Sequence, residues 1–280
     1  MSEAAEILFG VAGWSYEDWK DVVYPRGCKD TLRFVGERVR LIEVNSTFYR
    51  PPSAKTCASW AARTEDLGTL FTAKLPQEFT HAWSLDPELL RVTKEGFAAL
   101  ASSGRLCALL AQTNYRVEAT PNNVAHFARL RDAFADLAPL VVEVRHKTWN
   151  VPRAMEEMKR LGVTVAELDY PGAASGFSLD STMVHGAGGI AYFRLHGRNP
   201  AWFQKGAGRD EVYDWEYSPM EVMELEQRLL RIAKDSTRTL VVANNHFHGK
   251  AMKVVEQLVA WYRGLTQSGE AATRGPSPGG

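Results

Sequence analysis

The stretches LIEVN at residues 41–45 and VVEVR at residues 141–145 decide the fold class. Each is a short apolar run in which polar side chains occupy every second position near the end. Successive residues of a β-strand point to opposite faces, so the polar side chains of each run share one face. The positions with this two-residue period, here and in three further runs, are Glu43, Asn45, Glu143, Arg145, Thr72, Lys74, Tyr192, Arg194, His196, Val242 and Asn244.

Eight apolar, β-rich runs of this kind alternate with stretches of helical spacing. They lie near residues 7–13, 41–46, 70–75, 106–112, 140–145, 163–169, 190–196 and 238–244. Strands joined by helices must be parallel and are buried on both faces. Eight such units predict an α/β fold, a single-domain (β/α)8 TIM barrel, rather than an open doubly wound sheet. The open sheet is disfavoured because Trp14 occupies the first turn where close approach of a phosphate needs Gly.

The barrel is expected to span residues 1–265. Residues 266–280 are rich in Gly and Pro and have no apolar period, so we expect a disordered tail. The 33 basic and 33 acidic side chains balance, which gives no global attraction to nucleic acid or to an anionic membrane. Three distant cysteines and an N-terminus without an apolar signal segment predict a cytoplasmic protein, neither secreted nor inserted in a membrane.

The polar residues of the runs fall at the C-terminal ends of the expected strands, which is where barrel enzymes carry their catalytic groups. Glu43 and Glu143 are candidates for general acid and base, because burial late in an apolar strand can raise a carboxyl pKa toward neutrality. His196 is the best candidate for proton transfer. The alternative is an internal network of ion pairs between these carboxylates and neighbouring cations. Lys74, Arg145 and Arg194 favour an anionic or polyhydroxylated substrate.

Other chemistry stays open. An oxygen-rich site for a divalent metal is compatible with the residue types of Glu43, Glu143, Asp169 and His196, but their spacing is not diagnostic, so the cofactor is undefined. His246 and His248 alternate in a segment that we interpret as a solvated loop. The long insertion at residues 197–219, with Trp202, Phe203, Trp215 and Tyr217, is expected to form a lid over the barrel mouth.

The motifs, taken in order, resemble those of the domain of unknown function 72 family, also called YecE-like. They are VAGWSYEDW at 11–19, IEVNSTFYRPP at 42–52, KLPQEFTH at 74–81, VVEVRHKTW at 141–149, YFRLHGRN at 192–199, YDWEYSPMEV at 213–222 and VVANNHFHGKA at 241–251. The resemblance covers about residues 7–262 and implies a TIM barrel without a settled activity. It also implies a polar cluster at the strand ends, made of Glu43, Asn45, Tyr49, Lys74, His81, Glu143, Arg145, Trp149, Arg194, His196 and Asn244.

Three hypotheses on function follow. The leading one is an enzyme that acts on a small anionic or sugar-like substrate, with Glu43, Glu143 and His196 catalytic and the rest of the cluster binding substrate; no reaction can be assigned. The second is binding or processing of nucleic acid by a barrel of endonuclease IV-like architecture, which the neutral net charge disfavours. The third is a small-molecule binding protein without catalysis.

Overall fold

The computed structural model describes residues 6–171 and 189–273. The strands in this part of the chain all pair in parallel and form one sheet in the order β6-β5-β4-β3-β2-β1-β9-β8-β7. Their bounds are β1 (Glu6–Ala12), β2 (Leu41–Val44), β3 (Leu70–Lys74), β4 (Leu106–Gln112), β5 (Leu140–Glu143), β6 (Thr164–Val165), β7 (Glu167–Asp169), β8 (Ile190–Leu195) and β9 (Arg238–Ala243).

The two ends of this sheet, β6 and β7, are halves of one chain segment interrupted at Ala166. The first half pairs with β5 and the second with β8. The amide of Ala166 donates to the carbonyl of Val142 at 2.9 Å, and the hydroxyl of Thr164 donates to the carbonyl of Ile190 at 3.0 Å. This segment therefore bridges β5 and β8 and closes the sheet into an eight-stranded barrel, which confirms the predicted fold class.

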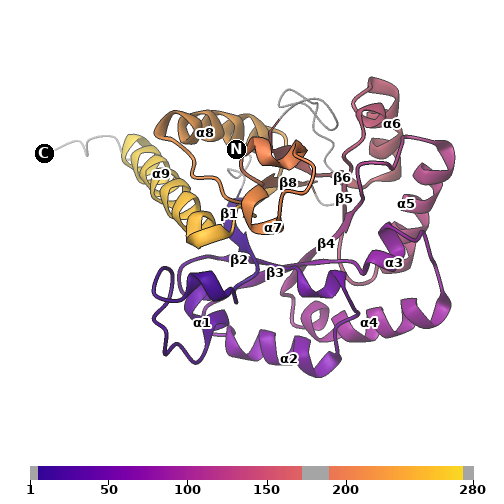
Figure 1. The fold of residues 1–280 in the computed structure, drawn as a ribbon, viewed down its shortest axis with the longest axis horizontal. Coiled ribbons are helices and arrows are strands. Elements are labelled where there is room, and N and C mark those ends of the chain that lie inside the picture. Colours follow the sequence, from indigo (N-terminus) through magenta and orange to yellow (C-terminus); the bar gives the residue numbers. More distant parts are fainter. Residues whose placement is uncertain (1–5, 172–188, 274–280) are drawn as a thin grey trace, which may run out of the picture.

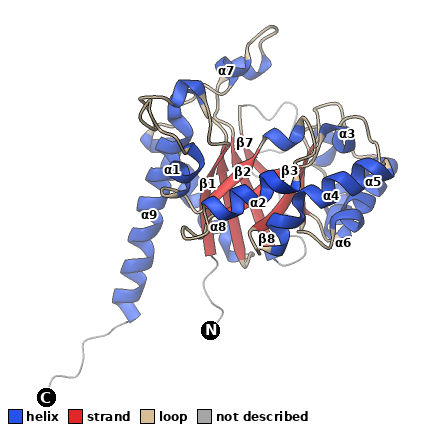
Figure 2. Ribbon diagram, turned by 90° about the horizontal axis from the view of Figure 1, so that it is seen from below, coloured by secondary structure: helices blue, strands red, loops and turns tan. Residues whose placement is uncertain are grey.

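Helices surround the barrel (Figure 1). Figure 2 shows the strands at the centre and α7 beyond the end toward which the arrowheads point. The bounds are α1 (Thr31–Gly36), α2 (Ala54–Arg63), α3 (Gln77–Thr80), α4 (Pro87–Ser102), α5 (Pro121–Phe134), α6 (Pro152–Leu161), α7 (Arg209–Val212), α8 (Pro219–Lys234) and α9 (Lys250–Thr273).

The longer helices begin where the sequence supplies a cap. The side chains of Ser53, Asp86 and Thr120 each accept a hydrogen bond from a backbone amide in the first turn of α2, α4 and α5. Ser218 and Glu221 form a reciprocal capping box at the start of α8. Proline occupies the first turn of α4, α5, α6 and α8, where a backbone donor would have no partner in the helix.

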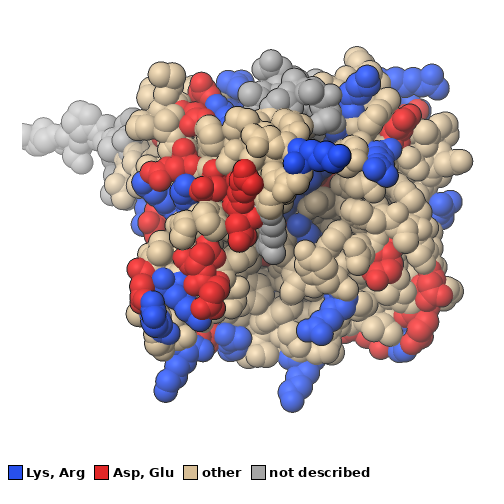
Figure 3. Space-filling view, viewed as in Figure 1, with Lys and Arg blue, Asp and Glu red and all other residues tan. Residues whose placement is uncertain are grey.

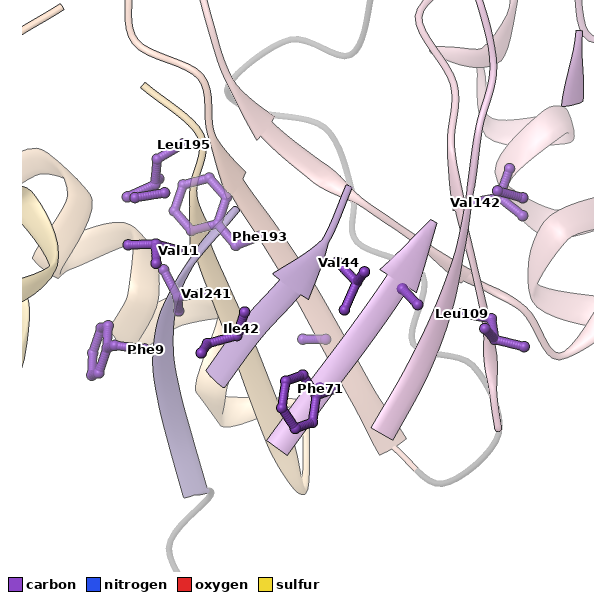
Figure 4. Packing of buried hydrophobic residues seen from close by; sticks show 14 of the residues in the cluster. Phe9, Val11, Ile42, Val44, Phe71, Leu109, Val142, Phe193, Leu195 and Val241 are labelled. Atoms are coloured by element: carbon purple, nitrogen blue, oxygen red, sulfur yellow. The ribbon is translucent and has the colours of Figure 1, made fainter. Parts of the chain in front are cut away.

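Alternate strand residues form two separate apolar layers. Side chains such as Phe9, Ile42 and Phe193 belong to the large layer between strands and helices (Figure 4). Those of the other parity, such as Leu41 and Leu110, fill the barrel interior. The interior is tight at Gly10, where a β-carbon would lie 1.9 Å from the carbonyl oxygen of Leu41. The two-residue period of the sequence therefore corresponds to an inner and an outer face of the barrel wall.

The observed elements follow the predicted runs closely, with two differences. The sixth run is split into β6 and β7, and the last helix, α9, extends to Thr273, past the expected end of the barrel domain at residue 265. Residues 274–280 lie outside the described part. Among the helices described, none is both long and apolar enough to cross a membrane.

Candidate functional site

Arg194 lies at the centre of a buried polar cluster in the upper part of the barrel. It comes from β8 and is fully buried. Its Nη2 donates to Oε1 of Glu43 at 2.6 Å, and its Nη1 donates to Oε2 of Glu143 and to Oε1 of Gln112, the latter at 3.1 Å. One guanidinium thus joins residues from β2, β4 and β5, which are distant in sequence.

Each of the two carboxylates has a second donor. The hydroxyl of Tyr192 donates to Oε2 of Glu43 at 2.8 Å, so the hydroxyl of Thr72, also at 2.8 Å, donates to Tyr192 in turn. On the other side, Nε of Arg145 donates to Oε1 of Glu143 at 2.7 Å. Charged hydrogen bonds of this kind are stronger than neutral ones, and they fix the orientation of both carboxylates.

The cluster keeps its charges at neutral pH. Burial alone would raise the pKa of Glu143, but Arg194 and Arg145 hold that pKa well below its usual value. Burial alone would lower the pKa of Arg194, but the carboxylates of Glu143 and Glu43 raise it. Glu143 is therefore an anion held between two guanidinium groups, which agrees with the ion-pair network weighed as the alternative for these residues.

His196 borders the cluster as a neutral imidazole. It is almost fully buried, and its Nδ1 lies 3.1 Å from the amide nitrogen of Asn244, which donates to it. The proton of the ring is therefore on Nε2, which lies 3.8 Å from Oε2 of Glu143. Burial and the charge of Arg194 lower the pKa of His196 to about 3. At neutral pH the ring carries no charge.

A small pocket opens above the cluster at the C-terminal ends of the strands. Its volume is about 180 Å³, and this face of the molecule is hollowed near its middle, with basic side chains inside the hollow (Figure 3). Ligand pockets for drug-sized molecules occupy roughly 300–1,000 Å³, so this one suits a small molecule. Its lining residues are Asn45, Phe48, Tyr49, Lys74, Gln112, Tyr213 and Asn244.

Lys74 is the cation that lines this pocket. Within the described residues its Nζ makes no hydrogen bond or ion pair and lies 5.8 Å from the centre of the Phe48 ring. Burial and the charge of Arg194 lower the pKa of Lys74 to about 7, although Glu43 and Glu143 act in the opposite direction. The amine is therefore close to its titration midpoint at neutral pH.

Two further polar atoms of the site have no partner in the described part of the chain. Oδ1 of Asn45 and Nε of Arg194 are both buried without a hydrogen bond. Buried polar groups are nearly always paired, because an unpaired one costs about 1–3 kcal/mol. Asn45 also lines the pocket.

The insertion at residues 197–219 contributes aromatic rings to the mouth of the barrel. Trp202 lies in a 3-10 turn, η5 (Pro200–Phe203). Its ring centre is 5.4 Å from the guanidinium of Arg145 and 5.6 Å from the centre of the His196 imidazole ring. Tyr213 packs edge-on against Trp202 at 5.1 Å and lines the pocket. The segment expected as a lid thus packs its rings against the polar cluster.

Two predicted substrate-binding residues lie differently from the others. Trp149 is fully buried in the outer layer, where its Nε1 donates to the carbonyl of Val117 at 2.7 Å. His81 borders the pocket through Phe48, whose ring centre lies 5.1 Å away. Burial, Arg145 and Lys74 lower the pKa of His81. The structure brings His81 toward the site and leaves Trp149 in the packing behind it.

Of the four ligands considered for a metal, Asp169 lies apart from Glu43, Glu143 and His196, which meet around Arg194. Asp169 lies on the outer face of β7, where it accepts from Arg198 and from the hydroxyl of Tyr217 at 2.8 Å. In the described part of the chain, no group of three or more His, Cys, Asp or Glu side chains has a metal-binding arrangement.

His246 and His248 were interpreted as lying in a solvated loop, and the structure confirms this for His248 only. His248 is exposed, but His246 is only 3% exposed and stacks on Tyr16 with ring centres 4.5 Å apart. The chain after β9 folds back over the barrel end, so this loop packs against the first βα connection instead of lying in solvent.

Three site residues were not among the sequence candidates. Gln112 is the last residue of β4 and pairs in register with Glu143, so its parity could have identified it. Tyr192 has the same parity as Arg194 and belongs to the two-residue pattern, but no role in the site was predicted for it. Tyr213 belongs to the insertion, whose sequence has no period that would indicate its direction.

A comparison with models of known protein families shows to which family this chain belongs. The family described as "Protein of unknown function DUF72" matches residues 8–276. The chain belongs to the DUF72 family. No curated protein matches it.

Solved structures agree with the assignment to DUF72. A DUF72 family protein from Thermotoga maritima is 28% identical with a TM-score of 0.81, over 92% of this chain and 99% of that one. Another from Enterococcus faecalis is 23% identical with a TM-score of 0.78, over 91% and 94%. A 3-keto-D-glucoside 4-epimerase from E. coli is 13% identical with a TM-score of 0.55, over 92% and 99%, which shows a shared fold.

Proposed function

We propose that this DUF72 protein is an enzyme that transfers a proton on a small, sugar-like substrate held at the C-terminal mouth of the barrel. The observation that supports this most strongly is the amine of Lys74, which lines the pocket without an ionic partner in the described residues. A lysine that loses its proton near neutral pH can accept one from a substrate and return it. The pKa of Lys74 is lowered to about 7, which fits that role.

The rest of the site supplies fixed charge and hydrogen bonds. Arg194 and Arg145 hold the carboxylates of Glu43 and Glu143, so the four charges nearly cancel and protonated Lys74 adds one positive charge. Fixed charges of this kind stabilise a developing negative charge without reorganising. In this proposal the predicted catalytic residues Glu43, Glu143 and His196 set the electrostatics around Lys74, and direct proton transfer by them stays a prediction.

The substrate class follows from the size and polarity of the pocket. Amide groups of Asn45, Gln112 and Asn244 lie beside the rings of Phe48, Tyr49 and Tyr213. Amides bind hydroxyl groups, and aromatic faces pack on the apolar face of a sugar. Two of the distant structural neighbours are sugar epimerases by name, a D-psicose 3-epimerase solved with D-fructose and the 3-keto-D-glucoside 4-epimerase, and both agree with a sugar-like substrate.

Deuterium exchange tests the proposal. A protein that removes and returns a C–H proton incorporates deuterium from D₂O into D-fructose or dihydroxyacetone, which NMR detects. Lys74→Arg keeps the positive charge but does not accept a proton, so we expect exchange to slow at least about 100-fold. Lys253→Arg is the matched control, because Lys253 is exposed and pairs with Glu216.

Two outcomes contradict the proposal. Equal exchange by the parent protein and Lys74→Arg removes Lys74 from the reaction. A thermal shift with these sugars but no exchange assigns the pocket to binding without catalysis.

A further inference from the structure

We infer that Lys74 forms a covalent imine with the carbonyl carbon of its substrate, which narrows the substrate class to small hydroxy-aldehydes and hydroxy-ketones. The inference rests on the function proposed above and adds a bond that proton transfer alone does not require. It starts from the position of the amine, which ends in a pocket of about 180 Å³ and not on the protein surface.

Lys74 differs from the paired lysines of this protein because its amine has no ion pair within the described residues. Lys20, Lys94, Lys250 and Lys253 each lie within an ion pair with a neighbouring carboxylate. The carboxylates that act electrostatically on Lys74 are those of Glu43 and Glu143, and both already accept hydrogen bonds from other residues. The amine of Lys74 is therefore not held in an ion pair that a substrate would have to break.

Imine formation needs a neutral amine, because an ammonium ion has no lone pair. The environment supplies this form, since burial and the neighbouring Arg194 lower the pKa of Lys74 to about 7. About half of the molecules then carry a neutral Lys74 at pH 7, against roughly one in a few thousand for an ordinary lysine with a pKa near 10.4. Desolvation and an adjacent cation are the usual ways in which proteins activate a nucleophilic lysine.

The walls of the pocket suit a molecule that has hydroxyl groups beside its carbonyl. Oδ1 of Asn45 is buried and unpaired within the described residues, and it can accept a hydrogen bond from a substrate hydroxyl. Gln112, at the end of β4, and Asn244, which follows β9, also line the pocket and carry their own amide groups. Filling the vacant acceptor of Asn45 would recover the free energy that its lack of a partner costs.

The chemistry balances without a cofactor. The lone pair of Nζ forms a bond to the carbonyl carbon, and the carbonyl oxygen takes up a proton to give a carbinolamine. Loss of that oxygen as water, with the last amine proton, leaves the imine; one amine and one carbonyl give one imine and one water. The protonated imine withdraws electrons from the adjacent carbon and makes the neighbouring C–H bond more acidic. Because Nζ is then bonded to the substrate, a base other than the amine of Lys74 accepts that proton.

Reductive trapping tests the bond. Sodium cyanoborohydride delivers hydride to the protonated imine and converts it into a stable secondary amine, which peptide mass spectrometry locates. With glycolaldehyde or dihydroxyacetone at pH 7, we expect Lys74 to be labelled at least tenfold faster than the exposed Lys253. Lys74→Arg should lose the adduct while labelling of Lys253 is unchanged.

The outcomes separate this inference from the proposed function. Labelling of Lys74 no faster than that of Lys253 with both probes overturns the imine. If Lys74-dependent deuterium exchange still occurs in that case, the proposed function stands with the amine as a simple base. An adduct on Lys74 without exchange supports the imine and contradicts the proton transfer, and absence of both results contradicts both.

Discussion

Two buried ion-pair clusters lie on opposite faces of the same barrel wall, and they differ in how completely their polar atoms are paired. The inner cluster is centred on Arg194 and faces the barrel interior. The outer cluster is centred on Asp169 and faces helix α8 and the insertion. Asp169 pairs in register with Leu195, the residue that follows Arg194, so the two clusters are separated by little more than the thickness of the sheet.

The outer cluster joins β7 to the elements packed against it. Arg228 from α8 donates to Glu167 and to the carbonyl of Leu168, and its guanidinium lies 4.5 Å from the centre of the Phe193 ring. Arg198 bridges Asp169 and Glu224, which also comes from α8. No buried side-chain nitrogen or oxygen of Asp169, Arg198 or Arg228 lacks a partner in the described chain.

The inner cluster has polar atoms left over, and this difference distinguishes a structural network from a candidate site. Nε of Arg194 and Oδ1 of Asn45 are buried without partners in the same described region, and Lys74 makes no ion pair there. Complete pairing is what stability alone requires of buried polar groups, and in our proposal the atoms left unpaired beside the pocket bind the substrate. The two clusters are alike in being buried and charged. They differ in how many of their buried polar atoms have a hydrogen-bond partner.

Removal of Arg194 should have the largest effect on stability. In Arg194→Met the carboxylates of Glu43 and Glu143 stay buried but lose their shared cation, which should lower the free energy of unfolding by about 3–5 kcal/mol. Urea denaturation measures the change. In the control Arg33→Met, which removes an exposed partner of Asp66, little change is expected. Similar losses in the two variants would mean that the inner cluster contributes no more than a surface pair.

A matched pair of substitutions sharpens the comparison. Glu143→Gln and Asp169→Asn each keep the shape of the side chain but remove its charge and turn an amide group toward a guanidinium. Both should lower the free energy of unfolding, by roughly 1.5–3 kcal/mol. Only Glu143→Gln should also lower the pKa of Lys74 below about 7, because the carboxylate of Glu143 raises that pKa in the parent protein.

The pH dependence of trace acetylation of Lys74 by acetic anhydride, followed by mass spectrometry, measures this second effect. Asp169 faces away from the interior, so Asp169→Asn should leave the acetylation profile unchanged. Equal displacement of the profile in both variants would show that the two clusters act on Lys74 alike, and the distinction between them would be lost.

The fold was predictable because its signals are local. The period of two in each run and the alternation of strands with helical stretches depend only on neighbouring residues, and the strands begin and end within a few residues of the predicted runs. The interruption at Ala166 was not predictable, because it arises where one strand changes its pairing partner from β5 to β8 to close the barrel. Partner exchange of this kind leaves no mark in the local sequence.

Most residues of the site could be predicted from the sequence, but the ion pairs between them could not. Parity brought Glu43, Glu143 and Arg194 to one interior, but the bridging of both carboxylates by one guanidinium depends on distances across the barrel. Asp169 was grouped with them by its place at a strand end, yet Leu168 before it faces the interior, so parity puts Asp169 outside. Trp149 lies in a 3-10 turn after β5, where the period of the strand no longer applies.

The pH dependence of stability gives a smaller and more specific test of Lys74. Its pKa is lowered from about 10.4 in the unfolded chain to about 7 in the folded one. Between these pH values the unfolded state binds more protons, so the contribution of Lys74 to the free energy of unfolding increases with pH, by at most about 1.4 kcal/mol per pH unit. Below pH 7 Lys74 is protonated in both states, and the cost of burying its charge destabilises the folded state fully.

The variant Lys74→Met lacks this pH-dependent contribution. The free energy of unfolding of the parent protein minus that of the variant should therefore increase between pH 7 and 9.5 in urea denaturation. The same difference measured for Lys253→Met should stay flat, and a flat difference for Lys74→Met would show that the amine of Lys74 titrates like an exposed lysine and that the inner cluster leaves no reactive group at the barrel mouth.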